Sequence, residues 1–493
     1  MPVQMASPVS TVESQSRPTV RIVIVGAGIS GLSAAYRLRE LAAETGQRLE
    51  LTLLESSDRA GGTIGTIRHN GFLIESGPDQ FVAAKPGVVS LANRLGVASE
   101  ILTPRDEYAR VLVARGDRLT PLPEGFALLA PARFWPVVRS PLFSWRGKCR
   151  MAFEPLVRPR QSDEDESIAS FVTRRLGPEV LQRAVQPLVG SVYGGDARHI
   201  SLAATAPQFA AMERSHGSLA RAFRRQRAAQ RRDDDRRAGG ARYGMFATFK
   251  LGMSTLPDAL AKSLGGACRF GVRVTAVQRR DRGWSVTQSD GQTIDANGVI
   301  LAGPAHGAAA LVRSTDPHLA DDLAAAPYRS TVVVHLAYPR EAIGHPLNAF
   351  GLVVADDQPG ELTAASFCNV KYEGRAPRGR VLLRACLGAR RDAQLLERED
   401  SQLVDAAVRD LTPLLRIAGE PRLATVHRHR NAMSQYHVGH LQRVAVIRRR
   451  ATRQPGLALA GNGYGGAGIA DCITTGEQAA TELFEQLTAS THI

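Results

Sequence analysis

Two short apolar runs near the start of the chain flank a segment of small and apolar residues. The runs VRIVIV at 20–25 and LELTLL at 49–54 have the length of buried strands in a parallel sheet. The segment between them, from Ile29 onward, predicts a helix that crosses from one strand to the next. The chain therefore opens with a predicted β-α-β unit.

The turn between the first strand and this helix carries glycines at informative positions. Gly26 allows a tight turn, Gly28 lets the backbone approach a pyrophosphate, and Gly31 lets the helix pack closely. Glu55 follows about 20 residues later, where a carboxylate accepts hydrogen bonds from a ribose diol and repels a 2′-phosphate. The pattern predicts a bound dinucleotide other than NADP. An ordinary glycine turn is the alternative, and the strand, helix and acid in their places disfavour it.

Further along the chain, helical and strand-like blocks alternate. A helical pattern at 86–96 precedes a strand at 110–114, and repeated prolines and aromatic residues at 121–159 indicate an apolar domain of loops and helices. Helices are also predicted at 167–188 and 202–212. Five further strands are predicted at 272–277, 283–287, 298–302, 331–336 and 381–385.

Residues 456–471 combine a buried strand, a glycine-rich loop and the start of a final helix. Backbone N–H groups at such a helix N-terminus would face the N1 and C2 carbonyl edge of a flavin, where negative charge accumulates on reduction. This arrangement suits a flavin better than a nicotinamide. A strand-loop-helix packing element without a ligand is the alternative.

The length and composition are those of a large globular protein. A chain of 493 residues, 44% hydrophobic, is long enough for two or three domains, and it contains no apolar run approaching the ~18 residues that cross a bilayer. The first 18 residues are polar and lack the apolar core of a secretory signal, so we expect a cytoplasmic protein with a disordered tail. The five cysteines are widely spaced, and we expect them to be reduced.

The net charge of +15 leaves the choice of partner open. Much of the charge lies in the arginine-rich segment 221–242, which contains no aromatic residues apart from Phe223. A solvated loop is the preferred interpretation of this segment, contact with a membrane surface comes second, and nucleic-acid binding a distant third.

Several motifs carry a resemblance to known flavoproteins. Residues 55–63, ESSDRAGGT, resemble the segment after the dinucleotide fold in the flavin amine oxidase superfamily. Within that superfamily, further stretches resemble the protoporphyrinogen/coproporphyrinogen III oxidase family, and they follow the family's order over nearly the whole chain. These stretches are residues 71–81, 186–202, 207–209, 371–377, 435–440 and 468–472.

The resemblance implies an α/β fold built from three parts. They are a discontinuous, Rossmann-like FAD-binding domain of the glutathione-reductase/amine-oxidase type, an α+β substrate domain, and a helical subdomain at the substrate and a membrane surface. The implied division of the chain is a tail at 1–18, FAD-binding parts at 19–84, 246–304 and 427–493, the helical subdomain at 85–245 and the substrate-binding sheet at 305–426.

The cofactor that the resemblance implies is non-covalent FAD. Glu55 would hold the ribose, Arg59 would lie near the diphosphate, and the backbone of Val274 would bond the adenine. The segments Gly77–Gln80 and Ala467–Ile469 would line the isoalloxazine. The predicted FAD-binding residues are Gly26, Ala27, Gly28, Ile29, Ser30, Gly31, Glu55, Ser56, Arg59, Gly61, Gly62, Thr63, Gly77, Pro78, Asp79, Gln80, Val274, Gly461, Ala467, Gly468 and Ile469.

The substrate that the resemblance implies is a porphyrinogen, a large and mostly apolar ring system with propionate arms. Such a ligand needs apolar walls and a few cations at the rim of its pocket. Lys85 and Arg110 are the predicted rim cations, and surface cations at loop ends are the alternative for both. Tyr193 and Gly194 complete the predicted substrate-binding residues.

The reaction implied by the family passes a hydride from a ring-bridging carbon to the flavin, which molecular oxygen reoxidises with release of hydrogen peroxide. Because the cofactor carries the difficult step, no catalytic acid or base is predicted. The expected partners are the porphyrinogen, oxygen and a peripheral membrane surface, without nucleic acid. The alternatives are an amine oxidase or carotenoid-type desaturase on the same scaffold, and a basic binding protein with structural FAD.

A few positions depart from the family pattern or suggest other chemistry. Ala470 and Ser434 stand where the family often has proline, and His429 stands where an aromatic residue is frequent, which affects one contact at the flavin edge. Cys472 suggests covalent flavin attachment, although a small packing residue is the preferred interpretation. No metal is predicted, because the following histidines lack a ligand pattern: His335, His345, His427, His429, His437 and His440.

Overall fold

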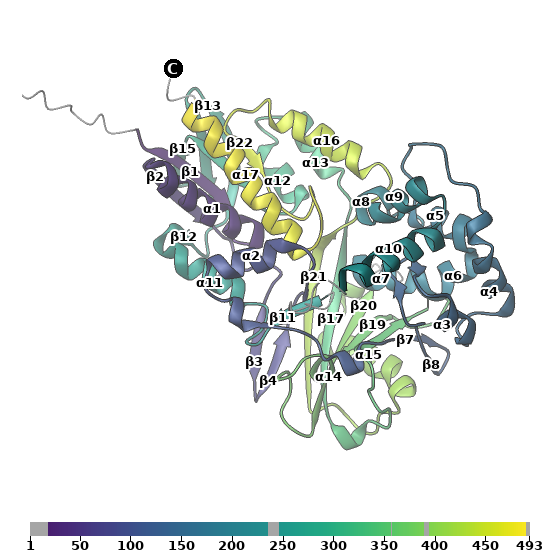
Figure 1. The fold of residues 1–493 in the computed structure, drawn as a ribbon. Helices are drawn as coiled ribbons and strands as arrows, with labels where there is room; N and C mark the ends of the chain where they lie inside the picture. Colours follow the sequence, from purple (N-terminus) through teal and green to yellow (C-terminus); the bar gives the residue numbers. More distant parts are fainter. Residues whose placement is uncertain (1–17, 235–245, 356, 389–393, 490–493) are drawn as a thin grey trace, which may run out of the picture.

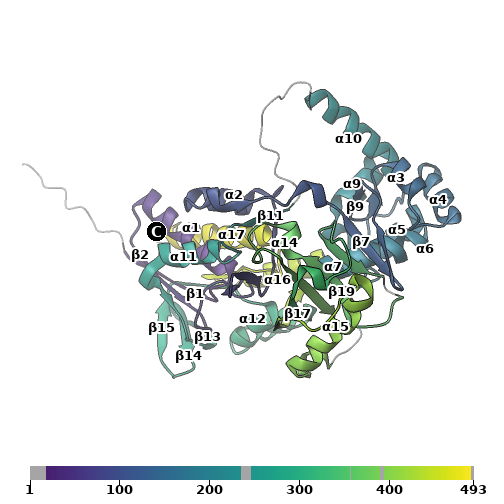
Figure 2. The same cartoon turned by 90° about the horizontal axis from the view of Figure 1, so that it is seen from below.

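The computed structural model describes residues 18–234, 246–355, 357–388 and 394–489. The predicted N-terminal tail, except for Pro18, and residues 235–242 of the arginine-rich segment lie outside this range. In the described part, a nucleotide-binding region, a large sheet and a group of helices lie next to one another (Figures 1 and 2).

A five-stranded parallel sheet organises the nucleotide-binding region. Its order is β12-β2-β1-β16-β22, so β1 lies at the centre and strands from distant parts of the chain pair beside it. The apolar runs predicted as the first two strands have the predicted bounds, and most of their side chains are buried or half-buried, with Arg21 and Glu50 the exceptions. The strands are β1 (Val20–Val25), β2 (Leu49–Leu54), β12 (Cys268–Arg269), β16 (Gly298–Leu301) and β22 (Leu457–Leu459).

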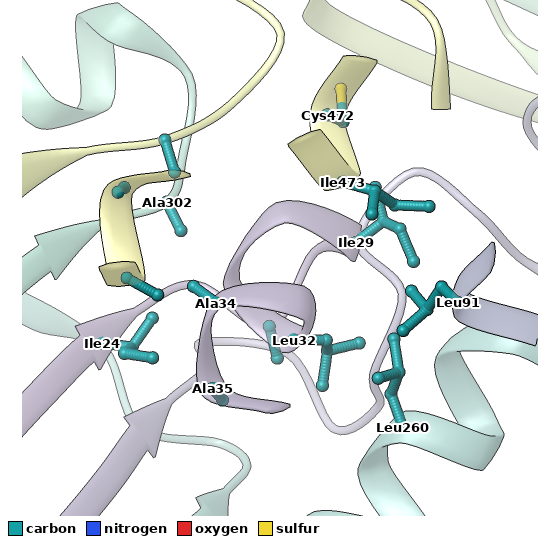
Figure 3. Packing of buried hydrophobic residues seen from close by; sticks show 14 of the residues in the cluster. Ile24, Ile29, Leu32, Ala34, Ala35, Leu91, Leu260, Ala302, Cys472 and Ile473 are labelled. Atoms are coloured by element: carbon teal, nitrogen blue, oxygen red, sulfur yellow. The ribbon is translucent and has the colours of Figure 1, made fainter. Parts of the chain in front are cut away.

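Four helices cover one face of this sheet. The crossover helix α1 (Ile29–Thr45) packs along α17 (Ile469–Ala489), with α2 (Pro86–Arg94) and α11 (Thr255–Leu264) beside them. Figure 3 shows the contact region, where Leu32 of α1, Ile473 of α17, Leu91 of α2 and Leu260 of α11 point into one core. Each of these fully buried side chains contributes about 1.5–3 kcal/mol.

The opposite face packs on a second core. Val23 and Leu301 of the sheet contact a three-stranded antiparallel sheet, in which Trp284 is buried, and three helices. These elements are β13 (Val274–Arg280), β14 (Gly283–Gln288), β15 (Thr293–Ala296), α12 (Ala305–Val312), α13 (Pro317–Ala324) and α16 (His440–Ala451).

A seven-stranded sheet of order β21-β17-β20-β19-β18-β7-β8 forms the second region. Its strands alternate between two faces, and the face that carries Val332, Val334 and Leu336 packs on α15 (Asp400–Leu415). The opposite face lies toward the nucleotide-binding region. The strands are β7 (Val111–Arg115), β8 (Arg118–Pro121), β17 (Tyr328–Pro339), β18 (Gly351–Val354), β19 (Leu362–Phe367), β20 (Arg380–Gly388) and β21 (Leu423–Ser434).

Short elements join the two regions. The β3-β4 hairpin and the three-stranded sheet β5-β11-β6 lie between them, and α14 follows β19. Their bounds are β3 (Thr66–His69), β4 (Phe72–Glu75), β5 (Phe81–Val82), β6 (Ile101–Leu102), β11 (Phe246–Phe249) and α14 (Cys368–Lys371).

The helical group lies at one end of the molecule in both views (Figures 1 and 2). Its core contains Phe171, Val180 and Ile200, and it also contacts Val353 of β18. The elements are β9 (Phe126–Ala127), β10 (Ala130–Pro131), α3 (Phe134–Arg139), α4 (Trp145–Ala152), α5 (Ile168–Leu176), α6 (Pro178–Val180), α7 (Gln186–Tyr193), α8 (Leu202–Thr205), α9 (Pro207–His216) and α10 (Leu219–Asp234).

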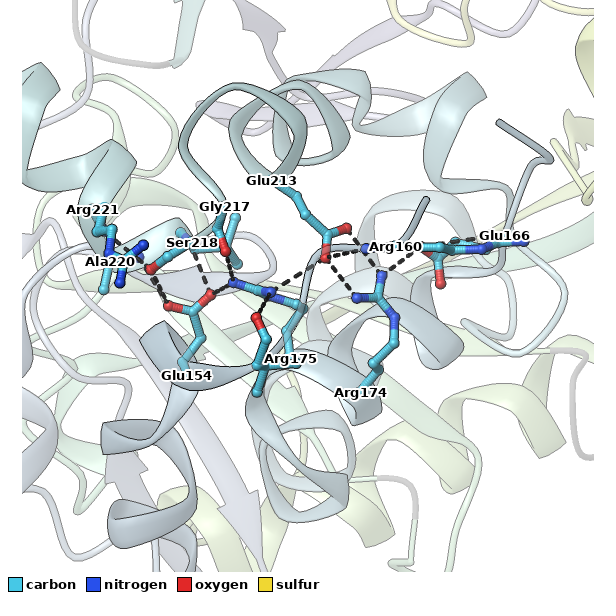
Figure 4. Close-up of polar contacts among 12 residues, drawn as sticks. Glu154, Arg160, Glu166, Arg174, Arg175, Glu213, Gly217, Ser218, Ala220 and Arg221 are labelled. Carbon is cyan, nitrogen blue, oxygen red and sulfur yellow. Dashed lines mark hydrogen bonds and ion pairs between the residues drawn. The ribbon is translucent and has the colours of Figure 1, made fainter. Parts of the chain in front are cut away.

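A buried ion network ties this group together (Figure 4). Arg175 has no exposed surface and contacts the carboxylates of Glu154 and Glu213. Glu154 also accepts hydrogen bonds from Ser218 Oγ at 2.6 Å and Leu219 N at 2.9 Å, which caps the start of α10. The network therefore fixes α10 to the helices beneath it.

Three predicted elements differ in the structure. The predicted helix 167–188 is broken at Gly177, whose φ of +97° ends α5 before Pro178, and a π-helical turn at Leu181–Val185 precedes α7. The predicted helix 202–212 is split into α8 and α9 at Pro207. The segment predicted as a solvated arginine-rich loop is helical as far as Asp234, because its cap at Glu154 and the buried Phe223 anchor the first turns.

Three segments also pack differently from the predicted division of the chain. Helices α12 and α13 belong to the core beneath the nucleotide-binding sheet rather than to the substrate sheet. Strands β7 and β8 pair into the seven-stranded sheet rather than joining the helical group, and β21 lies in that sheet up to Ser434. Core packing for the two helices and strand pairing between distant segments for β7, β8 and β21 determine these memberships, and composition reveals neither.

Candidate flavin site

The first glycine turn leaves space for a ligand on one side only. Gly26 has a φ of +105°, and a Cβ on Gly31 would lie 1.9 Å from the carbonyl oxygen of Gly26. A Cβ on Gly28, in contrast, would meet no atom within 4 Å. Gly28 is also the N-cap of α1 and offers no capping side chain, so the helix N-terminus faces open space. These features fit a pyrophosphate, which binds to uncapped helix N-termini.

Glu55 lies directly beside this turn. Its Oε2 accepts a hydrogen bond from Ala27 N at 2.8 Å, and its Oε1 accepts one from Ser57 N at 2.8 Å. The hydroxyl groups of Ser56 and Ser57 also donate to Oε1. A carboxylate can accept about four hydrogen bonds, so Oε2 keeps capacity for the hydroxyl groups of a ribose.

The segment that leads into β13 passes along the same edge. Gly271 N donates to Ser57 O and Val272 N donates to Glu55 O, both at 2.8 Å. Val274, the first residue of β13, follows two positions later. Val274, the predicted adenine contact, therefore lies close in the chain to Gly271 and Val272, which bond to Ser57 and Glu55.

Arg59 organises the loop after β2. Its guanidinium donates to the carbonyl oxygens of Ala60, Gly62 and Ile64 at 2.7–3.0 Å. The loop closes on the glycine turn, because Gly61 N donates to Ala27 O at 2.8 Å. The predicted residues Gly61, Gly62 and Thr63 are thereby brought to the N-terminus of α1.

The second glycine loop is held by two tyrosines. Tyr436 donates to Asn462 O at 2.6 Å, and Tyr328 donates to Asn462 Oδ1 at 3.2 Å. The neighbouring Gly461 has a φ of +137°, and its N–H donates to Thr475 Oγ1 of α17. These bonds position the loop that leads into the N-terminus of α17.

The two glycine loops meet where α1 and α17 begin. A Cβ on Gly476 of α17 would lie 2.2 Å from Ser30 O, so only glycine allows this approach. Ile29 and Ile473 pack together at the same place (Figure 3). Ala467 and Gly468 are exposed at the start of α17. The residues predicted to contact the two ends of FAD thus come together from opposite ends of the chain.

Gly77–Gln80, the segment predicted to line the isoalloxazine, is held from the side of the seven-stranded sheet. His429 Nε2 donates to Ser76 O at 2.7 Å, and Arg384 Nη2 donates to Gly77 O at 2.8 Å. Lys371 Nζ lies 3.4 Å from Asp79 Oδ2, and Tyr372 donates to Gln80 Oε1 at 3.1 Å. On its other side the segment packs tightly against the loop after β2, because a Cβ on Gly77 would lie 1.8 Å from Thr63 O.

The charges around this segment shift its ionisable groups. Burial alone would raise the pKa of Asp79, but Lys371 and Arg384 lower it to about 2, so Asp79 is ionised at neutral pH. Burial and the charge of Arg384 lower the pKa values of His335 and His429. Both histidines are therefore neutral, and His429 carries its proton on Nε2, which donates to a carbonyl oxygen.

Two of the predicted substrate residues lie near the start of α17. Lys85 Nζ contacts both carboxylate oxygens of Asp471 at 2.7 Å. Burial and the charge of Asp471 raise the pKa of Tyr193, whose carbonyl oxygen accepts a hydrogen bond from Gln435. Gly194, with a φ of +61°, caps α7 next to Tyr193.

Arg110 lies elsewhere, exposed at the start of β7. Its carbonyl oxygen accepts a hydrogen bond from Phe350 N at 2.9 Å. The charge of Lys85 is matched by Asp471, whereas that of Arg110 has no carboxylate within 4 Å in the described part of the chain. A role of either cation toward a substrate stays a prediction.

Four residues of the site were not predicted as site residues. His429 had been noted only as a departure from the family, Lys371 and Tyr372 only as part of a matching motif, and Arg384 not at all. Arg384 and His429 lie on the sheet face toward Gly77–Gln80, whereas Lys371 ends α14 and Tyr372 follows it. A charged residue within the apolar run Val381–Ala385 was the available signal for Arg384.

Comparison with known proteins agrees with this geometry. The model of the family "flavin containing amine oxidoreductase" matches residues 29–484, which run from the start of α1 through the second glycine loop and most of α17. The chain belongs to this family. Within it, the chain is a member of the group formed by coproporphyrinogen III oxidases and protoporphyrinogen oxidases.

Relatives in this flavoprotein family align over nearly their whole length. The chain is 32% identical to the coproporphyrinogen III oxidase of Bacillus subtilis, with 94% of this chain and 98% of that protein aligned. It is 34% identical to the coproporphyrinogen III oxidase of Propionibacterium freudenreichii, with 99% and 96% aligned. It is also 27% identical to the chloroplastic protoporphyrinogen oxidase of Nicotiana tabacum, with 97% and 87% aligned.

Solved structures support the same fold for this flavoprotein. A crystal structure assigned as a protoporphyrinogen oxidase, from Exiguobacterium sp. 255-15, has a TM-score of 0.84 at 27% identity and covers 96% of this chain and 100% of that one. A reduced UDP-galactopyranose mutase has a TM-score of 0.68 at 16% identity, covering 96% and 98%, and shows likeness of fold alone. The predicted α/β flavoprotein fold is confirmed.

The described part of this family member shows neither a metal-binding cluster nor a membrane-spanning helix. Within the described ranges, no three His, Cys, Asp or Glu side chains are grouped in a way that suits a metal ion. No helix in the same ranges combines the length and apolar character needed to cross a bilayer.

Proposed function

We propose that the protein is an FAD-dependent porphyrinogen oxidase that oxidises coproporphyrinogen III, protoporphyrinogen IX or both to the porphyrin, with oxygen as acceptor and hydrogen peroxide as product. This proposal rests on one observation. The two glycine loops, Glu55 and the segment Gly77–Gln80 lie together where α1 and α17 begin. The near-complete alignment with coproporphyrinogen III oxidases supports the choice of substrate.

The residues at this meeting point suit FAD. The open side of Gly28 and the uncapped start of α1 would take the pyrophosphate, and Glu55 would hold the ribose beside Val274. Gly77–Gln80 and Ala467–Ile469 would line the isoalloxazine, which when bound accepts a hydride and returns the electrons to oxygen. The chain's own residues bind and orient the reactants.

Non-covalent binding is part of the proposal. Cys472 is buried in the core between α1 and α17, and burial raises the pKa of its thiol to about 12. A protonated thiol is a poor nucleophile, which argues against attachment at this position. Acid denaturation should therefore release the yellow cofactor into the supernatant.

A peripheral membrane contact is also proposed. Five large apolar side chains in one stretch of the helical group are strongly exposed: Phe134 at 51%, Trp135 at 69%, Trp145 at 70%, Phe153 at 59% and Leu156 at 74%. Exposed Trp and Phe next to arginines are typical of surfaces that lie in the interface of an anionic membrane. Arg139 and Arg146 are exposed in the same stretch.

The basic helix α10 adds to this surface. The arginines at 221, 224, 225 and 227 are exposed, and α10 projects from the body of the molecule (Figure 2). This contact would hold the enzyme close to an apolar substrate. Membrane contact is also the role that we propose for the part of the arginine-rich segment that the structure describes.

Porphyrin fluorescence measured in air tests the proposed function. The purified FAD-loaded protein is incubated with each porphyrinogen in parallel, and peroxide is measured together with the porphyrin. We expect flavin-dependent formation of porphyrin from at least one substrate, faster than the non-enzymatic rate, with three peroxides released per porphyrin. A flavoprotein that leaves both porphyrinogens unoxidised but turns over an amine would support the amine oxidase alternative.

A further inference from the structure

Arg384 occupies the centre of the sheet face that looks toward Gly77–Gln80. In the strand register it lies opposite His335 of β17 on one side and Ser366 of β19 on the other, and His335 lies opposite Thr425 of β21. Residues directly opposite one another in a sheet share a face. The hydrogen bond from Arg384 Nη2 to Gly77 O shows that this face meets the segment predicted to line the isoalloxazine.

The positive charge of Arg384 lacks a direct counter-charge. In the described part of the chain, no carboxylate lies within 4 Å of its guanidinium, and the nearby Asp79 contacts Lys371 instead. Among the residues that the structure describes, Nη1 donates only to the sulfur of Cys386, at 3.3 Å, and Nε has no partner.

The neighbours on the sheet leave this charge uncompensated. Within the described ranges, both ring nitrogens of His335, Nε2 of His427 and Oγ1 of Thr425 are buried and have no hydrogen-bond partner. Burial lowers the pKa values of both histidines, so they are neutral, and the cluster of Lys371, Arg384 and Asp79 carries one excess positive charge. An interior charge without a partner is costly unless a ligand supplies the opposite charge.

The reduced form of a flavin supplies such a charge. Uptake of two electrons and one proton leaves the isoalloxazine with one negative charge, and nearby protein charges tune that change. We propose that Arg384 is a positioning residue that holds Gly77 against the isoalloxazine and raises the reduction potential of bound FAD by favouring its anionic reduced form. This inference rests on the proposed binding of FAD at Gly77–Gln80.

A propionate of the substrate is the competing counter-ion for Arg384. The two assignments differ in what they change: a charge that acts on the flavin alters its potential without substrate, whereas a charge that acts on a propionate alters KM. The hydrogen bond to Gly77 O favours the first assignment, because it directs the guanidinium at the flavin-lining segment.

The test is the midpoint potential of the FAD-loaded protein, measured by dye equilibration at pH 7 without porphyrinogen, in wild type, Arg384→Met and Arg428→Met. Arg428 is a matched control, because it lies in the same sheet, on β21 beyond β17, but on the other face, where it contacts Asp400. We expect Arg384→Met to lose about tenfold of the preference for reduced over oxidised FAD, which is about 30 mV for two electrons. Arg428→Met should keep the wild-type potential.

Three results would overturn the inference. They are an unchanged potential in FAD-loaded Arg384→Met, an equal fall in Arg428→Met, or a raised KM for porphyrinogen with an unchanged potential, which would assign Arg384 to the substrate. If Arg384→Met does not fold, Arg384→Gln, which keeps N–H donors without the charge, gives the same readout with the same expectation. Failure of the wild-type protein to bind FAD would instead refute the proposed function.

Discussion

Lys85 Nζ lies 2.7 Å from both carboxylate oxygens of Asp471, although the two residues are 386 positions apart. The contact joins the N-cap of α2 to the first turn of α17, where an acid is also favoured by the helix dipole. It also gives Lys85 a structural partner at the place where a substrate cation was predicted.

Replacing Lys85 separates these two roles. Because half of the Lys85 side chain is exposed, loss of the pair in Lys85→Met should cost less than about 1 kcal/mol of stability. A rise in KM for porphyrinogen of tenfold or more, with kcat retained, would assign Lys85 to the propionate arms. A wild-type KM together with a slightly lower Tm would make it a structural residue. Arg110→Met, measured in parallel, tests the other predicted cation.

Alanine substitutions at Gly28 and at Gly31 should change different properties, namely FAD binding at Gly28 and stability at Gly31. Gly28 has an ordinary φ of −66° and open space around it, so Gly28→Ala should keep the stability of the FAD-free protein and weaken FAD binding at least tenfold. Gly31→Ala places a methyl group 1.9 Å from Gly26 O, so it should lower the stability by about 3 kcal/mol or more. Thermal unfolding without FAD and titration with FAD distinguish the two. Equal losses of stability would contradict this assignment.

Glu75 should make the protein less stable as the pH rises. Burial raises its pKa to about 7, although Thr66 and Met253 donate hydrogen bonds to it. The folded state therefore prefers the protonated acid, and stability falls between the unfolded pKa near 4.5 and pH 7, by about 2–3 kcal/mol. Glu75→Gln should be the more stable protein at pH 8 and should lack this slope. Thermal unfolding from pH 5 to 8 measures both, and parallel curves for the two proteins would refute the prediction.

Arg175 should be the most sensitive residue of the helical group. Arg175→Met leaves Glu154 and Glu213 buried beside an apolar side chain, so it should cost about 3–5 kcal/mol in urea unfolding. Arg174→Met removes a partly exposed partner of Glu213 and should cost less, about 1 kcal/mol. Burial alone would raise the pKa of Glu213, but Arg174 lowers it. The stabilising effect of the ionised Glu213 carboxylate is therefore present above pH 4.5 and is lost as the pH falls below that value. Equal costs for the two variants would argue against a buried network.

The exposed aromatic residues should determine membrane contact. Trp135→Ser combined with Trp145→Ser removes two indole rings from the exposed stretch and should reduce sedimentation with anionic vesicles more than tenfold, without changing turnover of a detergent-solubilised substrate. Leu441→Ser is the control, because Leu441 is 51% exposed but lies on α16. Unchanged binding of the double variant, or equal loss in the control, would contradict the membrane contact.

Local signals were sufficient to predict the fold around the first glycine turn. Gly26, Gly28 and Gly31 follow a buried strand at informative spacing, and Glu55 lies at the end of the next strand, so turn geometry and strand pairing follow from neighbouring residues. The bounds of the first two strands were also correct for this reason. The second glycine loop could be recognised because a strand and a helix flank it directly.

Contacts between distant strands could not be predicted in this way. Arg384 and His429 reach Gly77–Gln80 only because β20 and β21 pair with β17 in one particular register. A shift by one residue would turn both side chains to the other face. The membership of β7 in the same sheet depends likewise on pairing with β18. The break at Gly177 and the helical start of α10 depend on packing and on the cap at Glu154.

The sheet at the proposed FAD site takes its central strand from residues 20–25 and an edge strand from residues 457–459, and α17 begins at the same site. During synthesis on the ribosome, the first glycine turn therefore emerges long before the elements that cover it. The two halves of the surface proposed to face FAD therefore come together only after both α1 and α17 have been synthesised.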